Sequence, residues 1–132
     1  MEEIGAAKIQ IREDIAKIIS AVAESDITKK VSAIEDRLFE FANFLEAKIA
    51  LLYVGGENEV QTRNIIKRAY SYNKIVVLPA FDPKTFEMEL MKVDKFAQEL
   101  KSGPRGVPEP DASRCKIVPI DRIDIAIIPG IA

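Results

Sequence analysis

The sequence has 132 residues, 48% hydrophobic and 30% charged, which is the balance of a globular protein long enough to bury one core. Its 19 basic and 21 acidic residues leave a formal charge of −2, so no overall positive field favours nucleic acid or an anionic membrane as a partner. A single cysteine, Cys115, and the lack of histidine exclude an internal disulfide, Cys/His zinc sites and Ser-His or Cys-His catalysis.

Two amphipathic helices are predicted at the N-terminus. The first covers residues 4–22, and the second runs from about Thr28 to Ala47 after the candidate caps Ser25 and Asp26. We expect both apolar stripes to cover a sheet; they comprise Ile4, Ala7, Ile11, Ile15, Ile18, Ile19 and Val22 in the first helix and Val31, Ile34, Leu38, Phe41 and Leu45 in the second. The start of the chain lacks the basic residues and apolar stretch of a signal peptide, and no apolar run approaches the roughly 20 residues of a membrane span, so a cytoplasmic location is expected.

The middle of the chain predicts a parallel sheet. Short apolar runs rich in β-branched residues at 49–54, 75–78 and 123–128 are typical of buried strands. A short helix is predicted between the first two strands, from Thr62 to Tyr72, which makes a β-α-β unit. These elements indicate an α/β fold with an open, mainly parallel sheet, in one domain spanning residues 1–132.

Three further segments lie between the second and third of these strands. Residues 86–90 alternate between apolar and acidic side chains, which predicts a strand with one wet face that carries Glu87 and Glu89. Asp94 is a candidate cap for a helical turn, and the segment GPRGVPEP at 103–110 holds Arg105 and Glu109 in a chain stiffened by three prolines. Composition alone leaves open whether this segment is a rigid lid over a ligand or a connector with nothing bound.

Lys8 and Arg12 are candidate anion-binding residues. At about 100° per residue, Lys8 falls about 40° and Arg12 about 80° from Ile4, within or beside the apolar stripe of the first helix. Cations on an inward face must be paired or point into a cavity, because an unpaired buried charge is costly. They either extend to the surface or pair with a carboxylate, or they form a phosphate or carboxylate site with Arg12 as a bidentate donor.

The loop after the first strand is a second candidate site. Gly55 and Gly56 open a segment that runs to Thr62, at the carboxyl end of a strand, where open α/β sheets bind their ligands. The helix that follows offers free N–H groups. We expect Glu59 to face a ligand and Glu57 to be solvated, although glycine and acidic residues also make plain turns. Cys115 stands between two basic residues that would lower the pKa of a thiol, but no base accompanies it and an incidental role is favoured.

These segments, taken in order, resemble the 5-formyltetrahydrofolate cyclo-ligase family, also called methenyltetrahydrofolate synthetase. The resemblance is carried over essentially the whole chain by KIQIR around Lys8 and Arg12, LLYVGGENEVQTRNII, VVLP, FEMELMKV, GPRGVPEP and IDIAIIPGIA. The last two segments are the most specific. Family members have a three-layer α/β/α, CoA-transferase-like fold, which we therefore expect for this chain.

The resemblance implies a function in folate one-carbon metabolism. The reaction is an ATP-dependent, magnesium-requiring closure of 5-formyltetrahydrofolate to 5,10-methenyltetrahydrofolate, with release of ADP and phosphate. By the same resemblance, Lys8 and Arg12 contact ATP phosphates, and Gly56, Glu59 and Gln61 lie along the folate. Gln61 stands where relatives often have an acidic residue. The resemblance assigns no catalytic residue and no metal ligand within this sequence.

The family pattern continues beyond the position of Ala132, into a glycine-rich stretch and Gly-Tyr-Tyr-Asp-Arg. We therefore expect a C-terminally incomplete domain with impaired activity, since glycine-rich amides and a magnesium ligand support phosphoryl transfer. The alternative hypothesis is a noncatalytic nucleotide- or folate-binding module of the same fold. It would act as a monomer or as a homo-oligomer formed through the open edge. A third interpretation keeps only the fold, with a different small anionic ligand.

Overall fold

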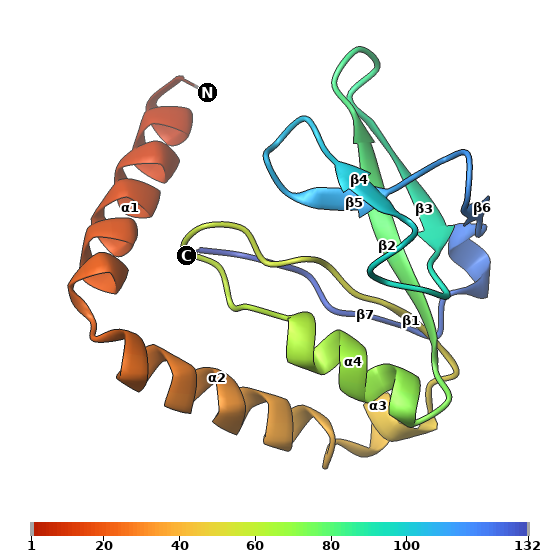
Figure 1. Cartoon of the computed structure of the whole chain (residues 1–132). Helices are drawn as coiled ribbons and strands as arrows, with labels where there is room; N and C mark the ends of the chain where they lie inside the picture. The colour runs from red at the N-terminus through yellow and green to blue at the C-terminus, as the bar shows by residue number, and fades with distance from the viewer. Residues whose placement is uncertain (1, 132) are drawn as a thin grey trace.

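A five-stranded sheet forms the centre of the structure, a computed structural model that describes residues 2–131 (Figure 1). The strand order is β6-β3-β2-β1-β7, with β1 (Ile49–Leu51), β2 (Ile75–Asp82), β3 (Glu87–Lys92), β6 (Lys116–Ile117) and β7 (Ile125–Ala126). β1 pairs in parallel with β2 and β7, whereas β3 runs antiparallel to both β2 and β6. The predicted α/β fold is therefore confirmed, and its three expected parallel strands are neighbours.

Helix α4 (Arg63–Ser71) supplies the predicted crossover between β1 and β2. Its Ile65, Ile66 and Ala69 are buried because they share one face of the helix, and they join the core beside β1 and β2. The largest fully buried side chains include Phe44, Leu52, Ile66, Leu78 and Met91. The core thus lies between α4 and the sheet, as the apolar strands and the amphipathic helix predict.

The second predicted helix is two helices in the structure. α2 (Glu24–Leu38) begins earlier than expected, so Ser25 and Asp26 lie in its first turn and are not caps. The chain then breaks at Phe39 and resumes as α3 (Ala42–Glu46). In one continuous helix, Phe39 and Phe44 would point about 140° apart. The break lets both rings enter the core, where they meet edge to face with centroids 5.1 Å apart.

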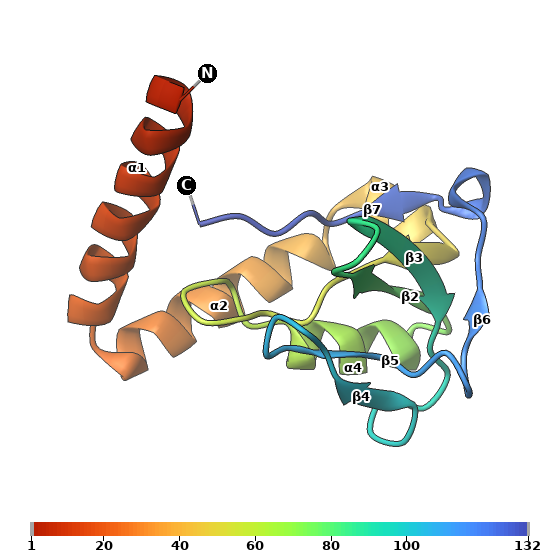
Figure 2. The ribbon, with the colours of Figure 1, turned by 90° about the horizontal axis from the view of Figure 1, so that it is seen from above.

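Helix α1 (Glu2–Ala21) has the predicted extent but not the predicted contacts. None of its residues is buried, and Ile4, Ile9, Ile11 and Ile18 are all more than half exposed. Figures 1 and 2 show α1 standing away from the sheet, joined to it through α2. The expectation that its apolar stripe covers the sheet is therefore wrong. No helix among residues 2–131 has the length and apolar character needed to cross a membrane.

The segment GPRGVPEP forms the turn and second strand of a hairpin. Before the hairpin the chain makes one helical turn, in which the Gln98 and Glu99 amides both donate to the Lys95 carbonyl oxygen. β4 (Leu100–Ser102) and β5 (Pro108–Pro110) pair antiparallel, and Gly106 takes a φ of +74° in the turn between them. Before β4, the Glu99 carboxylate accepts hydrogen bonds from the Asp94 and Lys95 amides, so Asp94 does not act as the expected cap. The hairpin contacts β2, which places it against the sheet.

Asp124 joins the start of β1 to the segment before β7. Its Oδ2 accepts hydrogen bonds from the Ile49 and Lys48 amides, at 2.8 Å and 3.0 Å, and these bonds hold its pKa below the ordinary value of 3.8. A depressed folded-state pKa contributes stability above about pH 3.8, and this contribution is lost as the pH falls through the folded-state pKa.

Asp124→Asn should make the stability of the protein fall less steeply with pH in the acid range, because the substituted side chain no longer titrates. The urea concentration at the unfolding midpoint, measured from pH 5 to pH 2, tests this. An unchanged pH profile would contradict this role.

Candidate functional site

A cavity of about 520 Å³ opens at the carboxyl ends of β1 and β2. Five segments form it: the end of β1 and the residues that follow, the loop after them, the β2-β3 pair, the β4-β5 hairpin and the C-terminal segment. Its lining residues are Leu51, Leu52, Tyr53, Val54, Gly56, Glu57, Glu59, Leu78, Pro79, Met88, Leu90, Arg105, Val107, Pro108, Glu109, Ile127, Ile128, Pro129 and Ile131. This is the edge at which parallel sheets of open α/β folds bind ligands.

Thr62, which follows the Gly55–Gln61 loop, ties the end of this loop back to its start. The buried Thr62 hydroxyl donates a hydrogen bond to the Tyr53 carbonyl oxygen and accepts one, at 3.2 Å, from the Gly55 amide. Gly55 fits only because it has no side chain, since a Cβ there would overlap the Val60 carbonyl oxygen. The sequence therefore folds this loop back on itself above the end of β1.

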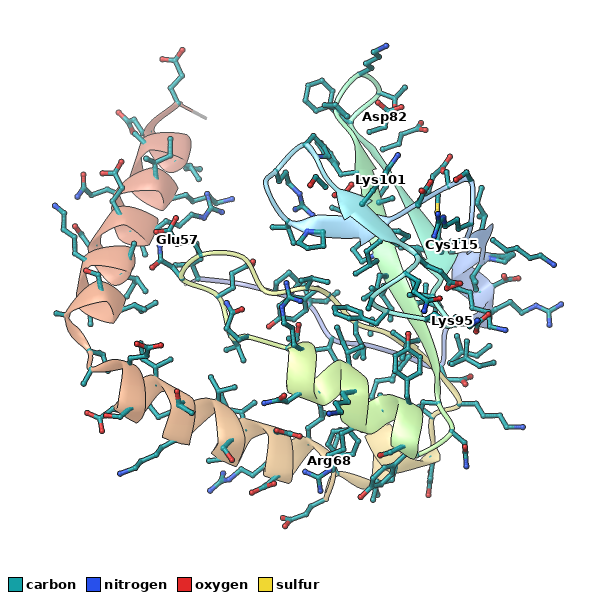
Figure 3. The ribbon with its side chains drawn as sticks, viewed as in Figure 1. Glu57, Arg68, Asp82, Lys95, Lys101 and Cys115 are labelled. Atoms are coloured by element: carbon teal, nitrogen blue, oxygen red, sulfur yellow. The ribbon has the colours of Figure 1, made fainter. Side chains whose placement is uncertain are left out.

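The three loop residues predicted to contact folate lie together but play different parts. Gly56 and Glu59 line the cavity, and the Gly56 amide donates a 2.9 Å hydrogen bond to Glu59 Oε1. Gln61 is exposed and outside the lining, and its Nε2 donates to the carbonyl oxygens of Gly56 and Glu59 at 2.9 Å and 3.3 Å. Gln61 thus braces the loop, while Glu59 is positioned to meet a ligand. Glu57 is exposed at the loop tip, on the side where α1 lies (Figure 3).

Lys8 and Arg12 lie outside this cavity. Both are exposed on α1, so they do not face a covered interior as the helical wheel predicts. Neither forms an ion pair within residues 2–131. Figure 1 places α1 on the same side of the molecule as the Gly55–Gln61 loop. The structure therefore gathers the predicted loop residues but does not bring the two cations to them.

The β4-β5 hairpin forms one wall of the cavity, whereas the sequence alone left the role of this segment open. Arg105 and Glu109 both line the cavity, and a Cβ built on Gly56 would lie 3.4 Å from Val107 of the hairpin turn. Glu109 is 3% exposed, and its Oε1 accepts a 3.2 Å hydrogen bond from the Phe81 amide. Of the two interpretations left open, the contacts favour a ligand-facing segment. In the sequence, the feature that could have indicated a ligand-facing role is the position of the Glu109 carboxylate between two prolines.

The pKa shifts of Tyr53, which lines the cavity, and of Cys115, which does not, bear on the site. Burial, followed by the charge of Glu59, raises the pKa of Tyr53, so the phenol stays a neutral hydrogen-bond donor. Burial and the nearby Glu99 also raise the pKa of Cys115, which overturns the expectation that its basic neighbours would lower it. Figure 3 shows Cys115 far across the molecule from Glu57. The thiol is incidental to the site, as favoured from the sequence.

The lining of the cavity suits a mostly apolar molecule that carries a few polar atoms. Apolar side chains form most of its lining, and Glu59 and Glu109 supply carboxylates on two different walls. Within residues 2–131, no three His, Cys, Asp or Glu side chains gather in a way that could hold a metal ion.

Comparison with known proteins identifies related chains. The model of the 5-formyltetrahydrofolate cyclo-ligase family matches residues 4–132. A probable 5-formyltetrahydrofolate cyclo-ligase of Caenorhabditis elegans is 26% identical over 136 residues, covering 100% of this chain and 66% of that protein. A 5-formyltetrahydrofolate cyclo-ligase of Haemophilus influenzae is 24% identical, covering 93% of this chain and 66% of that protein. The chain thus spans about two thirds of the length of the curated relatives it matches.

Solved structures share the fold. The NMR structure of Aquifex aeolicus 5,10-methenyltetrahydrofolate synthetase superposes with a TM-score of 0.81 at 21% identity, covering 95% of this chain and 61% of that one. The Mycoplasma pneumoniae 5,10-methenyltetrahydrofolate synthetase gives a TM-score of 0.63 at 16% identity, covering 92% of this chain and 63% of that one. At these identities the superpositions establish the architecture alone.

Proposed function

The chain belongs to the 5-formyltetrahydrofolate cyclo-ligase family, and on that basis we propose that it takes part in ATP-dependent cyclisation of 5-formyltetrahydrofolate to 5,10-methenyltetrahydrofolate. The observation that carries the proposal is the 520 Å³ cavity, which the Gly55–Gln61 loop and the β4-β5 hairpin border from two sides. A reduced folate presents ring carbons to the apolar lining and a few polar atoms to the carboxylates of Glu59 and Glu109. A cytoplasmic location is part of the same proposal.

The proposed chemistry is a phosphoryl transfer followed by ring closure. The γ-phosphoryl group of ATP passes to the formyl oxygen, the second folate nitrogen attacks the formyl carbon and loses its proton, and the carbon-oxygen bond breaks to release phosphate. ADP and 5,10-methenyltetrahydrofolate are the other products. Positioning and neutralisation of phosphoryl charge supply most of the catalysis in such transfers, which is consistent with a histidine-free chain.

The chain's own residues would divide this work between pocket and helix. Gly56 and Glu59 would hold the folate at the end of β1, with Gln61 fixing the loop conformation by its two hydrogen bonds. Lys8 and Arg12 fit a phosphate group because they are exposed cations one turn apart on α1. Magnesium would neutralise phosphate charge as the ion of the nucleotide complex, and no residue of this chain is assigned to it.

The proposal is tested by the absorbance of methenyltetrahydrofolate formed from 5-formyltetrahydrofolate. Because the activity of this chain is expected to be impaired, the expected result is slow product formation that requires protein, ATP and magnesium together and that falls further in Glu59→Ala. Folate binding without turnover would favour the noncatalytic binding module over the enzyme. A chain that binds neither ATP nor 5-formyltetrahydrofolate would count against both.

Arg12→Ala is expected to weaken ATP binding by about tenfold or more, because a charge-assisted hydrogen bond to phosphate is lost. Lys17→Ala is the matched control, since Lys17 is an exposed cation on the same helix but about 140° away from Arg12 around its axis. Calorimetric titration with magnesium-ATP measures both variants. Equal affinities for Arg12→Ala and the native chain, with folding intact, would remove the assignment of Arg12 to the phosphates.

A further inference from the structure

Glu109 is a buried carboxylate with one oxygen left over. It is 3% exposed, and within residues 2–131 it is the only acidic residue among the buried ones. Its Oε1 accepts the 3.2 Å hydrogen bond from the Phe81 amide, whereas its Oε2 is buried and has no hydrogen-bond partner among the described residues. Buried polar atoms are nearly always paired, and an unpaired charged acceptor is especially unfavourable, so this oxygen calls for a partner that comes from outside the chain.

The one cation nearby does not supply that partner. Arg105 Nη2 lies 3.8 Å from Glu109 Oε2, which is beyond hydrogen-bond distance. The guanidinium carbon sits 5.6 Å from the centre of the Phe81 ring, and the Arg105 side chain is 49% exposed. Arg105 therefore offsets part of the negative charge while it stays at the mouth of the cavity, and Oε2 is left as an acceptor.

The hairpin holds the Glu109 side chain where it is. Pro108 and Pro110 restrict the backbone on both sides of it. Gly103, on the opposite side of the turn, faces the carboxylate so closely that a Cβ built there would lie 2.5 Å from Glu109 Cδ. The carboxylate thus cannot easily turn out to water, and it is fixed on the wall of the cavity that it lines.

We propose that Glu109 Oε2 is a ligand-binding acceptor that takes a hydrogen bond from an N–H group of the cavity's occupant. The group that fits is a neutral amino substituent on a flat heterocycle, because the surrounding wall is apolar and includes Leu78, Leu90 and Ile127. The identity of the occupant rests on the proposed function: the pterin ring of a reduced folate carries an exocyclic amino group of this kind. Glu109 would then orient the ring, while Glu59 meets it from the loop.

The test compares two ligands that differ only in the amino group. The probes are 5-formyltetrahydrofolate and its 2-desamino analogue, titrated calorimetrically into the 132-residue chain without ATP. The native chain should prefer the amino compound by about 10- to 100-fold, the usual range for a hydrogen bond to a charged group. Glu109→Gln should reduce this ratio to near one. Its amide oxygen must stay with the Phe81 N–H, so an NH₂ donor replaces the acceptor that faces the ligand.

Two further variants separate this role from general effects. Glu89→Gln, an exposed change on β3, is the matched control and should leave the preference intact. Gly103→Ala keeps the Glu109 carboxylate but displaces it, and should lower the preference as Glu109→Gln does. Thermal unfolding of each variant shows that the folded protein is being titrated.

The outcomes for the inference and for the proposed function are distinct. A preference that persists in Glu109→Gln, or a native chain that shows no preference for the amino group, overturns the role of Glu109 even if the chain forms methenyltetrahydrofolate. A preference that collapses in Glu109→Gln supports this role even if the chain shows no turnover.

Discussion

Gly55→Ala is expected to lower the affinity for 5-formyltetrahydrofolate at least tenfold and to destabilise the fold by about 1–3 kcal/mol, the usual effect of overpacking. A Cβ at Gly55 would overlap the Val60 carbonyl oxygen and lie 3.1 Å from Gln61 Cα. Both obstacles are backbone, so the loop itself must move. That movement would break the hydrogen bond from the Gly55 amide to Thr62 and displace Glu59 from the cavity. Affinity is measured by calorimetry and stability by urea unfolding.

Gly5→Ala is the control for this substitution. A Cβ at Gly5 has no neighbouring atom within 4 Å, and Gly5 lies inside helix α1. Alanine there should stabilise the helix by about 0.5–1 kcal/mol and leave folate affinity unchanged. If Gly55→Ala binds 5-formyltetrahydrofolate as tightly as the native chain, the loop conformation is not needed for binding and the site assignment fails.

Leu52→Ala is expected to destabilise the protein by about 2–5 kcal/mol and to impair folate binding. Leu52 is 2% exposed and lines both the 520 Å³ cavity and a smaller one of about 130 Å³ beneath α2. Leu52 lies between the two cavities together with Tyr53 and Ile127, so its truncation would widen the floor under the ligand. The expected loss of stability is large because the packed residues around Leu52 cannot move far enough to fill the space that its side chain leaves.

Leu45→Ala is the matched comparison, since Leu45 is 42% exposed on α3. Leu45→Ala should lower the free energy of unfolding by less than about 1 kcal/mol. Urea unfolding monitored by circular dichroism gives both values. Equal destabilisation by the two substitutions would show that Leu52 is not part of the cooperative core beneath the cavity.

The sheet was predictable because its signals are local. Short β-branched runs mark β1, β2 and β7, and the pattern of Ile65, Ile66 and Ala69 marks α4 between β1 and β2. The break at Phe39 was not predictable from periodicity, because the helical pattern continues through it. The helix breaks because Phe39 and Phe44 both pack into the same core, and this packing is a tertiary contact that the local pattern does not contain.

The candidate site divides in the same way. Gly56 and Glu59 follow a strand directly, so their place at the sheet edge follows from the sequence. Glu109 lies 50 residues further along the chain, and only the β4-β5 hairpin brings it to the same cavity. The inward-facing placement of Lys8 and Arg12 came from the helical wheel. A wheel says which residues share a face, but it does not say whether anything covers that face, and α1 has no buried residue.

Folate is proposed to bind in the cavity between the Gly55–Gln61 loop and the β4-β5 hairpin. The most direct test of this placement is an NMR titration of the ¹⁵N-labelled chain with 5-formyltetrahydrofolate. We expect the amide resonances of Gly55, Gly56, Glu59 and Phe81 to shift, the last because its N–H is bonded to Glu109, while those of α1 stay unchanged. Shifts confined to residues outside the cavity, or no shifts at saturating ligand, would contradict this placement.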